Sequence, residues 1–383
     1  MTSHFRHLSS PRPAGEIKAG HRVPATEEDL HRLLAELGIR PPGPLTCELV
    51  STWAAKHVWR LKAGGEPFVY VRYLLGPASL FPDRWRHMRL GEMLYDARVG
   101  PRILGVIPES EALGGRAAIV EAALEPISPA ELAARAEEAI LLMARLHSYV
   151  PLHEALSADL IEADRLGVSS LARLFTETRE RWFEAVVPRW LEVGLSEITD
   201  LQSIVGELLS ELQKAPIQTG RIGLVVPAHH DPNHGNFMVN RQGALRLIDF
   251  EGLALDNPVA DLGVFLDWYV EPERHRALLK AYPLADPDAV LERMRVWVPL
   301  RYIEIAAYWA ARLTRARDSE AWLYAASSLH EWLSAAARLI YSEGPPARAG
   351  VALEDILAAL LARTTLAEDA GQGDDEAEHK KLA

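Results

Sequence analysis

A predicted β-hairpin around residue 240 constrains this chain more than any other feature. Residues 237–239 (Phe-Met-Val) and 244–248 (Ala-Leu-Arg-Leu-Ile) have strand composition, and the Asn-Arg-Gln-Gly segment between them is typical of a turn. Asn236 precedes the first strand and Asp249 follows the second. Pairing of the strands about the turn therefore brings Asn236 and Asp249 together at the open end of the hairpin. Asp231, five residues before Asn236, arrives there on the preceding loop.

These three side chains bring two carboxylates and one amide carbonyl to a small volume. Such hard oxygen ligands suit Mg²⁺, which usually takes one or two protein groups and leaves its other positions to water and phosphates. The order Asp, Asn, Asp is also the one that kinase-type phosphoryl transfer requires. The first carboxylate orients the substrate hydroxyl, and the Asn and the second Asp hold the metal. The sequence therefore predicts a magnesium-dependent phosphotransfer site.

Two other interpretations of this segment remain open. A zinc site is one, because His229, His230, Asp231 and His234 are all candidate ligands, although four within six residues are crowded for one closed site. The other is purely structural, because Asp and Asn commonly serve as turn residues and helix caps. The structural interpretation accounts neither for the second acidic cluster nor for its distance from the turn.

The same segment resembles the H-G-D-x-x-x-x-N and I-D-F/W-E signatures of the aminoglycoside phosphotransferase and choline kinase family, small-molecule kinases related to protein kinases. Six residues match position by position: His229, Asp231, Asn236, Asp249, Phe250 and Glu251. His230 stands where the family usually has Gly. The resemblance implies an α+β, two-lobed protein-kinase-like fold, with a small antiparallel-sheet N-lobe and a larger, mostly helical C-lobe. It also implies that Asp231 and His229 are catalytic, and that Asn236 and Asp249 bind the metal.

Four segments are expected along the chain. They are an N-terminal extension with one helix (1–44), a nucleotide-binding N-lobe (45–126), a catalytic and substrate-binding helical C-lobe (127–365) and a disordered acidic tail (366–383). Strands are expected at 47–51, 58–61, 67–74, 103–107 and 117–122. Helices are expected at 26–38, 84–98, 129–149, 200–214, 274–282, 288–311, 319–340 and 353–362.

The resemblance also assigns nucleotide contacts in the N-lobe. Arg72 falls where the family has the strand Lys or Arg that contacts the nucleotide phosphates, and Glu92 falls where a helical acid orients that cation. Glu121 and Ala123 fall in the hinge, whose backbone groups hydrogen-bond the adenine. We therefore expect ATP or GTP to bind here as the phosphate donor.

The segment 51–57 departs from the family pattern because it contains no glycine. A phosphate-covering loop normally uses glycine so that backbone N–H groups approach the phosphates closely. Ser51, Thr52 and Lys56 are expected to contact phosphate through their side chains instead. The departure keeps open a kinase-like protein that binds nucleotide or a partner without turnover. Nucleotidyl transfer, with ATP bound in a flipped pose, is a further alternative.

The acceptor is expected to be a small, amine-bearing molecule, such as an aminoglycoside-like compound, an amino alcohol or a related metabolite. Asp267, Trp268 and Glu304 are the expected contacts, because a cation gains from charge pairing and cation–π interaction. Trp309, Trp322 and Trp332 are expected to fill the helical core instead.

Composition bounds the class of protein. The net charge of −12 disfavours a nucleic-acid binder, which usually has a basic face. The one cysteine, Cys47, cannot form an internal disulfide, which favours a reducing compartment. No apolar signal segment or run long enough to span a bilayer is evident in the sequence. We therefore expect a soluble, cytoplasmic enzyme, and its oligomeric state stays open.

Overall fold

The computed structural model describes residues 24–53, 56–157, 170–195, 197–214, 225–316, 319–341, 354–356 and 358–360. Contacts group the chain into two compact units, which we treat separately. Unit 1 holds residues 1–158 and 226–255, and unit 2 holds 159–225 and 256–383. The lobe boundaries expected from the sequence follow a different criterion and stay predictions. The expected acidic tail, 366–383, lies outside the described residues.

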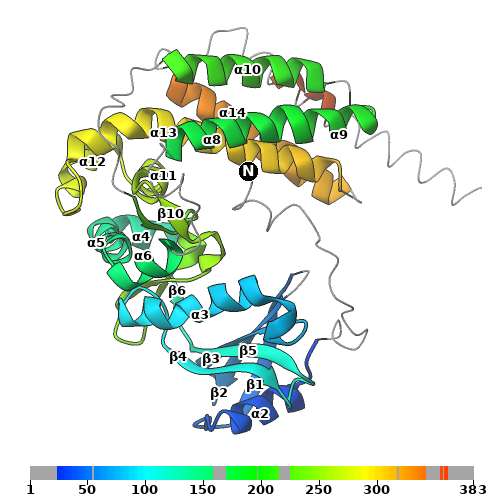
Figure 1. Cartoon of the computed structure of the whole chain (residues 1–383), viewed down its shortest axis with the longest axis vertical. Helices are drawn as coiled ribbons and strands as arrows, with labels where there is room; N and C mark the ends of the chain where they lie inside the picture. The colour runs from blue at the N-terminus through cyan, green and yellow to red at the C-terminus, as the bar shows by residue number, and fades with distance from the viewer. Residues whose placement is uncertain are drawn as a thin grey trace, which may run out of the picture. The chain divides into compact units, whose positions relative to one another are not determined.

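A five-stranded antiparallel sheet forms the N-terminal part of unit 1 (Figure 1). The strand order is β1-β2-β3-β5-β4. The strands are β1 (Leu45–Trp53), β2 (Lys56–Ala63), β3 (Glu66–Leu74), β4 (Ile103–Ser110) and β5 (Arg116–Ala122). The expected antiparallel sheet is therefore confirmed. Because β1 continues to Trp53 and β2 begins at Lys56, the expected 51–57 loop is wrong: most of that segment is paired strand.

The two faces of this sheet have different partners. Val69, Val71 and Tyr73 alternate along β3 and are fully buried. They pack in one core with the apolar stripe of α2 (Glu27–Glu36), formed by its buried leucines Leu30, Leu33 and Leu34. Thr26 caps α2 in a capping box with Asp29. The other face carries the partly buried residues of β3, including Arg72.

The described part of unit 1 has four further helices, and one expected helix proves to be two. They are α3 (Pro82–Asp96), α4 (Pro129–Ala134), α5 (Ala136–His147) and α6 (Val150–Ser157), with a 3₁₀ turn, η2 (Ala78–Leu80), before α3. The single helix expected over 129–149 is wrong, because the chain leaves helical geometry at Arg135 (φ −102°, ψ 22°). The Arg135 side chain donates there to Glu138 and to the carbonyl of Gly243, a tertiary contact that periodicity along the chain does not reveal.

Short strands near residue 240 form the predicted hairpin. β8 (Phe237–Val239) pairs antiparallel with β9 (Leu245–Leu247), and β6 (Glu125–Pro126) pairs with the other edge of β8. β7 (Val226–Ala228) pairs with β10 (Ala254–Asp256), whose last residue already belongs to unit 2. Single 3₁₀ turns, η4 (His234–Asn236) and η5 (Phe250–Gly252), precede β8 and follow β9.

Unit 2 is helical in its described part (Figure 1). A run of α8 (Ser170–Glu180), a π-helical turn η3 (Arg181–Val186) and α9 (Val187–Glu192) packs along α13 (Pro287–Leu313). The indole N–H groups of Trp182 and Trp190 donate to the carbonyls of Ile303 and Ala310 at 2.9 and 2.8 Å. The other helices are α10 (Ile198–Lys214), α11 (Val259–Tyr269), α12 (Pro272–Leu279) and α14 (Ser319–Ile340).

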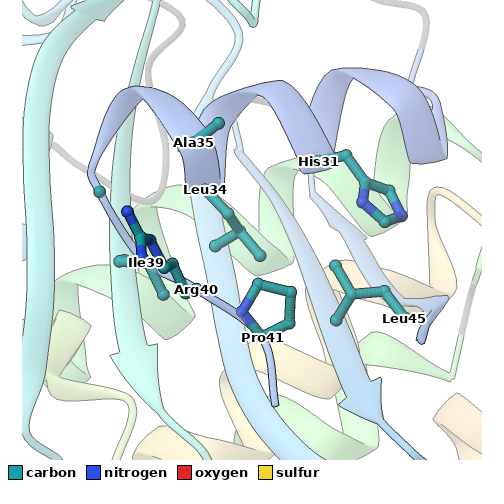
Figure 2. Close-up of a pocket in the computed structure, with 8 residues that line it drawn as sticks. His31, Leu34, Ala35, Ile39, Arg40, Pro41 and Leu45 are labelled. Carbon is teal, nitrogen blue, oxygen red and sulfur yellow. The ribbon is translucent and has the colours of Figure 1, made fainter. Parts of the chain in front are cut away.

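A pocket of about 390 Å³ lies in unit 1 at the end of α2 and the start of β1. Figure 2 shows its walls, which include Leu34, Ile39, Pro41 and Leu45. The lining includes no residue that the sequence predicts for the active site. Separately, none of the helices in the described ranges combines the length and the apolarity that a membrane span requires.

Candidate active site

The hairpin brings Asn236 and Asp249 to its open end, as predicted. Phe237 pairs with Leu247, and the next backbone N–H, that of Ile248, donates to the carbonyl of Asn236 at 2.9 Å. The turn closes because the side-chain oxygen of Asn240 accepts from the backbone N–H groups at 242 and 244, and because Gly243 adopts a φ of +76°. Asn236 and Asp249 therefore flank one short, hydrogen-bonded element.

The loop before β8 holds Asp231 against Asn236. The exposed Asp231 carboxylate accepts from the side-chain amide of Asn233 at 2.7 Å and from that of Asn236 at 2.9 Å. The Asn236 amide also donates to the Asp231 backbone carbonyl at 2.9 Å. Because its nitrogen serves as this donor, the buried Asn236 side chain keeps its oxygen as the atom for a cation. Asp231 and Asn236 thus form one unit, in which the carboxylate faces solvent.

His229 is a positioning residue, which corrects its expected catalytic role. The ring is fully buried, and its Nε2–H donates to the carbonyl of Ile248 at 2.8 Å. Nδ1 accepts from the backbone N–H of Asp231 at 3.3 Å. A ring edge also contacts Phe250, with the centroids 4.9 Å apart. Both nitrogens of the imidazole are engaged by backbone groups, so His229 fastens the Asp231 loop to the hairpin instead of meeting a substrate.

Left-handed backbone occurs at two positions of the site. Among the described residues, the non-glycine residues with positive φ are Arg98, His230 and Asp249. Their conformation costs on the order of 1 kcal/mol or more each, and such strain gathers at functional sites. His230, which stands where the family usually has Gly, has a φ of 68°. The left-handed geometry explains that preference for glycine, and His tolerates it better than a β-branched residue does.

Asp249 lies beside Lys56, the first residue of β2. The Lys56 Nζ is 3.6 Å from the Asp249 Oδ1, and that oxygen is buried without a hydrogen-bond partner. The Asp249 side chain as a whole is 47% exposed. Burial lowers the pKa of the Lys56 ammonium; the neighbouring Asp249 carboxylate opposes this, and Arg72 reinforces it. Lys56, expected to contact phosphate, therefore adjoins a predicted metal ligand.

Arg72 has a different partner from the one expected. Its Nε is 3.0 Å from a carboxylate oxygen of Glu121 on β5, and both side chains are mostly buried. Glu92, expected to orient Arg72, instead pairs with Arg89 one turn earlier in α3 at 2.8 Å, so that prediction is wrong. The pairing of β3 with β5 shows why Glu121 is the partner of Arg72. Arg72 pairs with Ile119, two residues before Glu121, so Arg72 and Glu121 share one face of the sheet.

The remaining predicted nucleotide contacts divide into two groups. The backbone N–H of Ala123 donates to the carbonyl of Phe68 at 3.1 Å, so the expectation that it binds adenine is wrong for this donor. Glu121, expected to act through its backbone, contributes its side chain to the ion pair with Arg72. The side chains of Ser51 and Thr52 lie outside the described part of the chain.

The predicted acceptor residues in unit 2 differ in exposure: Glu304 is buried, whereas Asp267 is exposed. Glu304 is 2% exposed and pairs with Arg301 and with Arg181, so its expected role as an acceptor contact is wrong. Asp267 is exposed and accepts from the hydroxyl of Tyr302. Burial and the Asp267 carboxylate raise the pKa of Tyr302, which keeps it a donor. Trp268 and Tyr302 both contact Trp332, with ring centroids 5.5 and 5.0 Å apart.

The zinc interpretation receives no support from this geometry. Within the described ranges, no three His, Cys, Asp or Glu side chains gather as a metal centre would require. Nε2 of His229 donates to a backbone carbonyl. That nitrogen therefore carries the hydrogen and has no lone pair for a metal in this arrangement.

Solved structures of known phosphotransferases share the fold. The wild-type aminoglycoside 2'-phosphotransferase-IIIa in complex with GDP matches with a TM-score of 0.53 at 15% identity, over 81% of this chain and 99% of that one. Spectinomycin phosphotransferase APH(9)-Ia, solved with ADP and spectinomycin, matches with a TM-score of 0.51 at 12% identity, over 80% and 97%. ADP-bound aminoglycoside phosphotransferase APH(2'')-Ib matches with a TM-score of 0.50 at 14% identity, over 82% and 99%.

At these identities the matches show the fold, which is the two-lobed kinase-like α+β fold that the sequence predicts. A family model described as the phosphotransferase enzyme family matches residues 86–297, more than half of the chain and including the whole hairpin. The chain therefore belongs to the phosphotransferase enzyme family.

Proposed function

We propose that this protein transfers the γ-phosphate of ATP or GTP, in a Mg²⁺-dependent reaction, to a hydroxyl of a small amine-bearing molecule. The observation that carries the proposal is the hydrogen-bonded pair of Asp231 and Asn236 on the loop that leads into the hairpin closed by Asp249. The similar structures named above hold ADP or GDP, which supports a nucleotide donor.

Asp231 serves as the group that receives the acceptor hydroxyl. Its carboxylate is exposed, and two side-chain amides orient it from within the loop. A carboxylate held this way accepts the hydroxyl proton and aligns the oxygen with the phosphorus, and such positioning supplies much of the rate in phosphoryl transfer. His229 contributes by holding the loop to the hairpin backbone.

The donor set beside Asp231 suits Mg²⁺. Asp249 offers a carboxylate oxygen that is buried without a hydrogen-bond partner, and Asn236 offers an amide oxygen. Mg²⁺ takes such hard oxygen ligands and commonly needs only one or two from the protein. When bound, the ion neutralises charge on the transferring phosphate. Asn236 and Asp249 are thus the residues that would hold it.

The acceptor amine is assigned to the Asp267 cluster of unit 2, defined as Asp267, Trp268, Tyr302 and Trp332. Asp267 offers an exposed carboxylate, and the half-buried Trp268 and Trp332 offer aromatic faces. An ammonium group gains both charge pairing and cation–π attraction from such a set. Glu304 is left out, because its carboxylate is already engaged by two arginines.

The test is a product assay on wild type and Asp231→Asn with ATP or GTP, Mg²⁺ and a panel of amino sugars and amino alcohols. We expect an acceptor mass increased by one phosphate, and a kcat at least ~10²-fold lower in the variant with nucleotide affinity retained. Asp96→Asn, an exposed change in the same unit, is the matched control. A product carrying a nucleotidyl group would establish nucleotidyl transfer instead.

One observation favours the alternative of a non-catalytic, nucleotide-binding protein. The tip of the β1–β2 hairpin, residues 51–57, contains no glycine to bring backbone N–H groups to the phosphates. Nucleotide-dependent stabilisation without any modified acceptor, and with equal behaviour of wild type and Asp231→Asn, would establish that alternative.

A further inference from the structure

Three arginines from different elements of unit 1 lie around strand β9 and form the arginine cluster: Arg98 after α3, Arg145 in α5 and Arg246 in β9. Side chains alternate along a strand, so Arg246 points away from the fully buried Leu245 and Leu247. The backbone N–H of Leu247 donates to the carbonyl of Val99 at 2.9 Å. Because Arg98 directly precedes Val99, this bond brings the end of α3 to the edge of β9, next to Arg246.

Helix α5 brings Arg145 to the same place. The helix lies against β9, because the backbone N–H of Leu245 donates to the Glu138 carboxylate at 3.0 Å. Arg145 is about two helical turns after Glu138 and therefore lies on the same side of α5. Arg98 and Arg145 are exposed, whereas Arg246 is partly buried. Solvent therefore reaches the cluster, and a small ligand can approach it.

The positive charges of the cluster act on one another. Burial lowers the pKa of the Arg246 guanidinium, and the charges of Arg145 and Arg98 lower it further. The Tyr95 hydroxyl and the Glu138 carboxylate oppose this change in pKa. Of these two opposing neighbours, only Glu138 is an acid.

Glu138 is already engaged by other groups. Its carboxylate accepts from Nε and Nη2 of Arg135 at 2.8 and 2.6 Å, as well as from the N–H of Leu245. Arg246 donates to the backbone carbonyl of Leu245 at 2.7 Å, and this acceptor is uncharged. Within the described ranges, none of the three cluster arginines forms an ion pair with a carboxylate. The cluster therefore keeps a net positive charge.

The backbone at Arg98 is strained as well. Helix α3 ends in a Schellman motif, in which the N–H of Val99 donates to the carbonyl of Leu94 at 2.8 Å. The N–H of Arg98 donates to the carbonyl of Tyr95, also at 2.8 Å. The residue at this place is usually glycine because its φ is positive, and Arg98 has a φ of 57°. Folding gains neither from this strain nor from the repulsion within the cluster, whereas a bound anion removes the repulsion.

We propose that the arginine cluster is a binding site for a dianionic phosphate group, either inorganic phosphate or a small phosphate monoester. Guanidinium groups present paired N–H donors that match phosphate oxygens, and three of them satisfy more oxygens of one dianion than a single one does. None of the three arginines belongs to the predicted nucleotide, metal or acceptor sites, so the site is separate from the proposed function and does not depend on it. A phosphate group held by all three links α3, α5 and β9, and so stabilises the folded chain.

Titration of the nucleotide-free full chain with inorganic phosphate, followed by thermal shift and by calorimetry at constant ionic strength, tests the proposal. The variants are Arg145→Gln and Arg98→Asn, both at exposed positions, the second with a residue that tolerates left-handed backbone. Arg40→Gln, which changes an exposed arginine of unit 1 outside the cluster, is the matched control. We expect the wild type and the control to bind phosphate with the same Kd, and the cluster variants to bind it at least about tenfold more weakly.

The melting temperature without phosphate is a second readout, which a merely structural role of the arginines would move in the opposite direction. Removing one charge relieves the repulsion, so both cluster variants should melt above the wild type without phosphate and gain less stability when phosphate is added. Arg40→Gln should change neither quantity. Lower melting temperatures in both cluster variants, with unchanged phosphate affinity, would show that the arginines serve only the fold.

Three other outcomes would overturn the proposal. The first is an equal phosphate Kd in the wild type and both cluster variants. The second is stabilisation by chloride equal to that by phosphate at the same ionic strength, which is screening alone. The third is loss of the phosphate effect at saturating Mg²⁺–nucleotide, which places the phosphate in the nucleotide site.

The same titration with glycerol 1-phosphate distinguishes the two sources of the phosphate group. Tighter binding of the ester assigns the site to a small phosphate monoester, and tighter binding of inorganic phosphate assigns it to the free ion. A wild type that binds no nucleotide would contradict the proposed function, and the phosphate affinities of the cluster variants would still decide the assignment of this site.

Discussion

Asp249 in unit 1 and Glu304 in unit 2 are acids beside basic side chains, yet their surroundings are opposite. The Asp249 side chain is 47% exposed, has Lys56 at 3.6 Å and keeps one buried oxygen without a hydrogen-bond partner. Glu304 is 2% exposed, and Arg181 and Arg301 pair with its two oxygens. Charge pairing alone therefore does not mark a functional carboxylate. A buried carboxylate oxygen without a hydrogen-bond partner, on a residue with left-handed backbone, is the better reason to propose a functional role. Neither feature stabilises the fold.

Removing the buried charge should have the largest effect on stability. Glu304→Gln leaves two arginines in unit 2 without their carboxylate, and breaking such a buried pair costs on the order of 3 kcal/mol. Urea unfolding followed by tryptophan fluorescence measures this loss. Triphosphate affinity should remain unchanged, because Glu304 has no role in the nucleotide site.

Glu192→Gln is the matched control in the same unit. Glu192 pairs with Arg189 on the surface, with both side chains more than half exposed, so its loss should cost under about 0.5 kcal/mol. Equal losses of stability in Glu304→Gln and Glu192→Gln would contradict the claim that the buried ion pairs of Glu304 stabilise the fold more than an exposed pair does.

Asp249→Asn should have the opposite effects to Glu304→Gln: a small loss of stability without ligand and a large loss of stabilisation by ligand. Asn tolerates left-handed backbone, but the change removes the carboxylate 3.6 Å from the mostly buried Lys56 ammonium, so the free energy of unfolding without ligand should fall by on the order of 1 kcal/mol, less than in Glu304→Gln. At 100 times the Kd, Mg²⁺–ATP stabilises the wild type by about 2.7 kcal/mol, and this gain should disappear in the variant. A thermal-shift titration with and without Mg²⁺ measures it, with Asp96→Asn as a control that keeps the shift. A full Mg²⁺-dependent shift in Asp249→Asn would contradict the metal assignment.

Asp267 is an intermediate case, because Tyr302 takes one of its oxygens while the side chain remains exposed. Asp267→Asn should raise KM for an amine-bearing acceptor about tenfold, in keeping with the loss of one exposed charge pair and its hydrogen bond. KM for the nucleotide and the melting temperature should hardly change. Asp288→Asn, an exposed carboxylate paired with Arg276 in the same unit, is the control. An unchanged acceptor KM would remove Asp267 from the acceptor site.

Predictions that depend on neighbours along the chain agree with the structure. The hairpin turn at Asn240 and Gly243 and the helix over 319–340 both appear where the sequence predicts them. Each depends on interactions within a few residues, such as a side-chain oxygen that meets a backbone N–H. The break at Arg135 was not predicted, because its bond to Gly243 joins residues 108 apart, and the helices α6, α8, α9 and α11 were not among the expected ones either.

Partners of charged groups were not predictable in the same way. Arg72, Lys56 and Glu304 each have a basic or acidic type that is evident in the sequence, but their partners depend on strand register and on helix packing. A one-residue change of register would move Arg72 to the other face of the sheet. The resemblance of residues 229–251 to the signatures of a known family was sufficient to predict that the chain is a phosphotransferase of that family. Only the tertiary structure decided that Glu121, and not Glu92, pairs with Arg72, and that the Glu304 carboxylate is engaged by arginines whereas Asp249 is half exposed. Electrostatic partners are set by distance in space and not by distance in sequence.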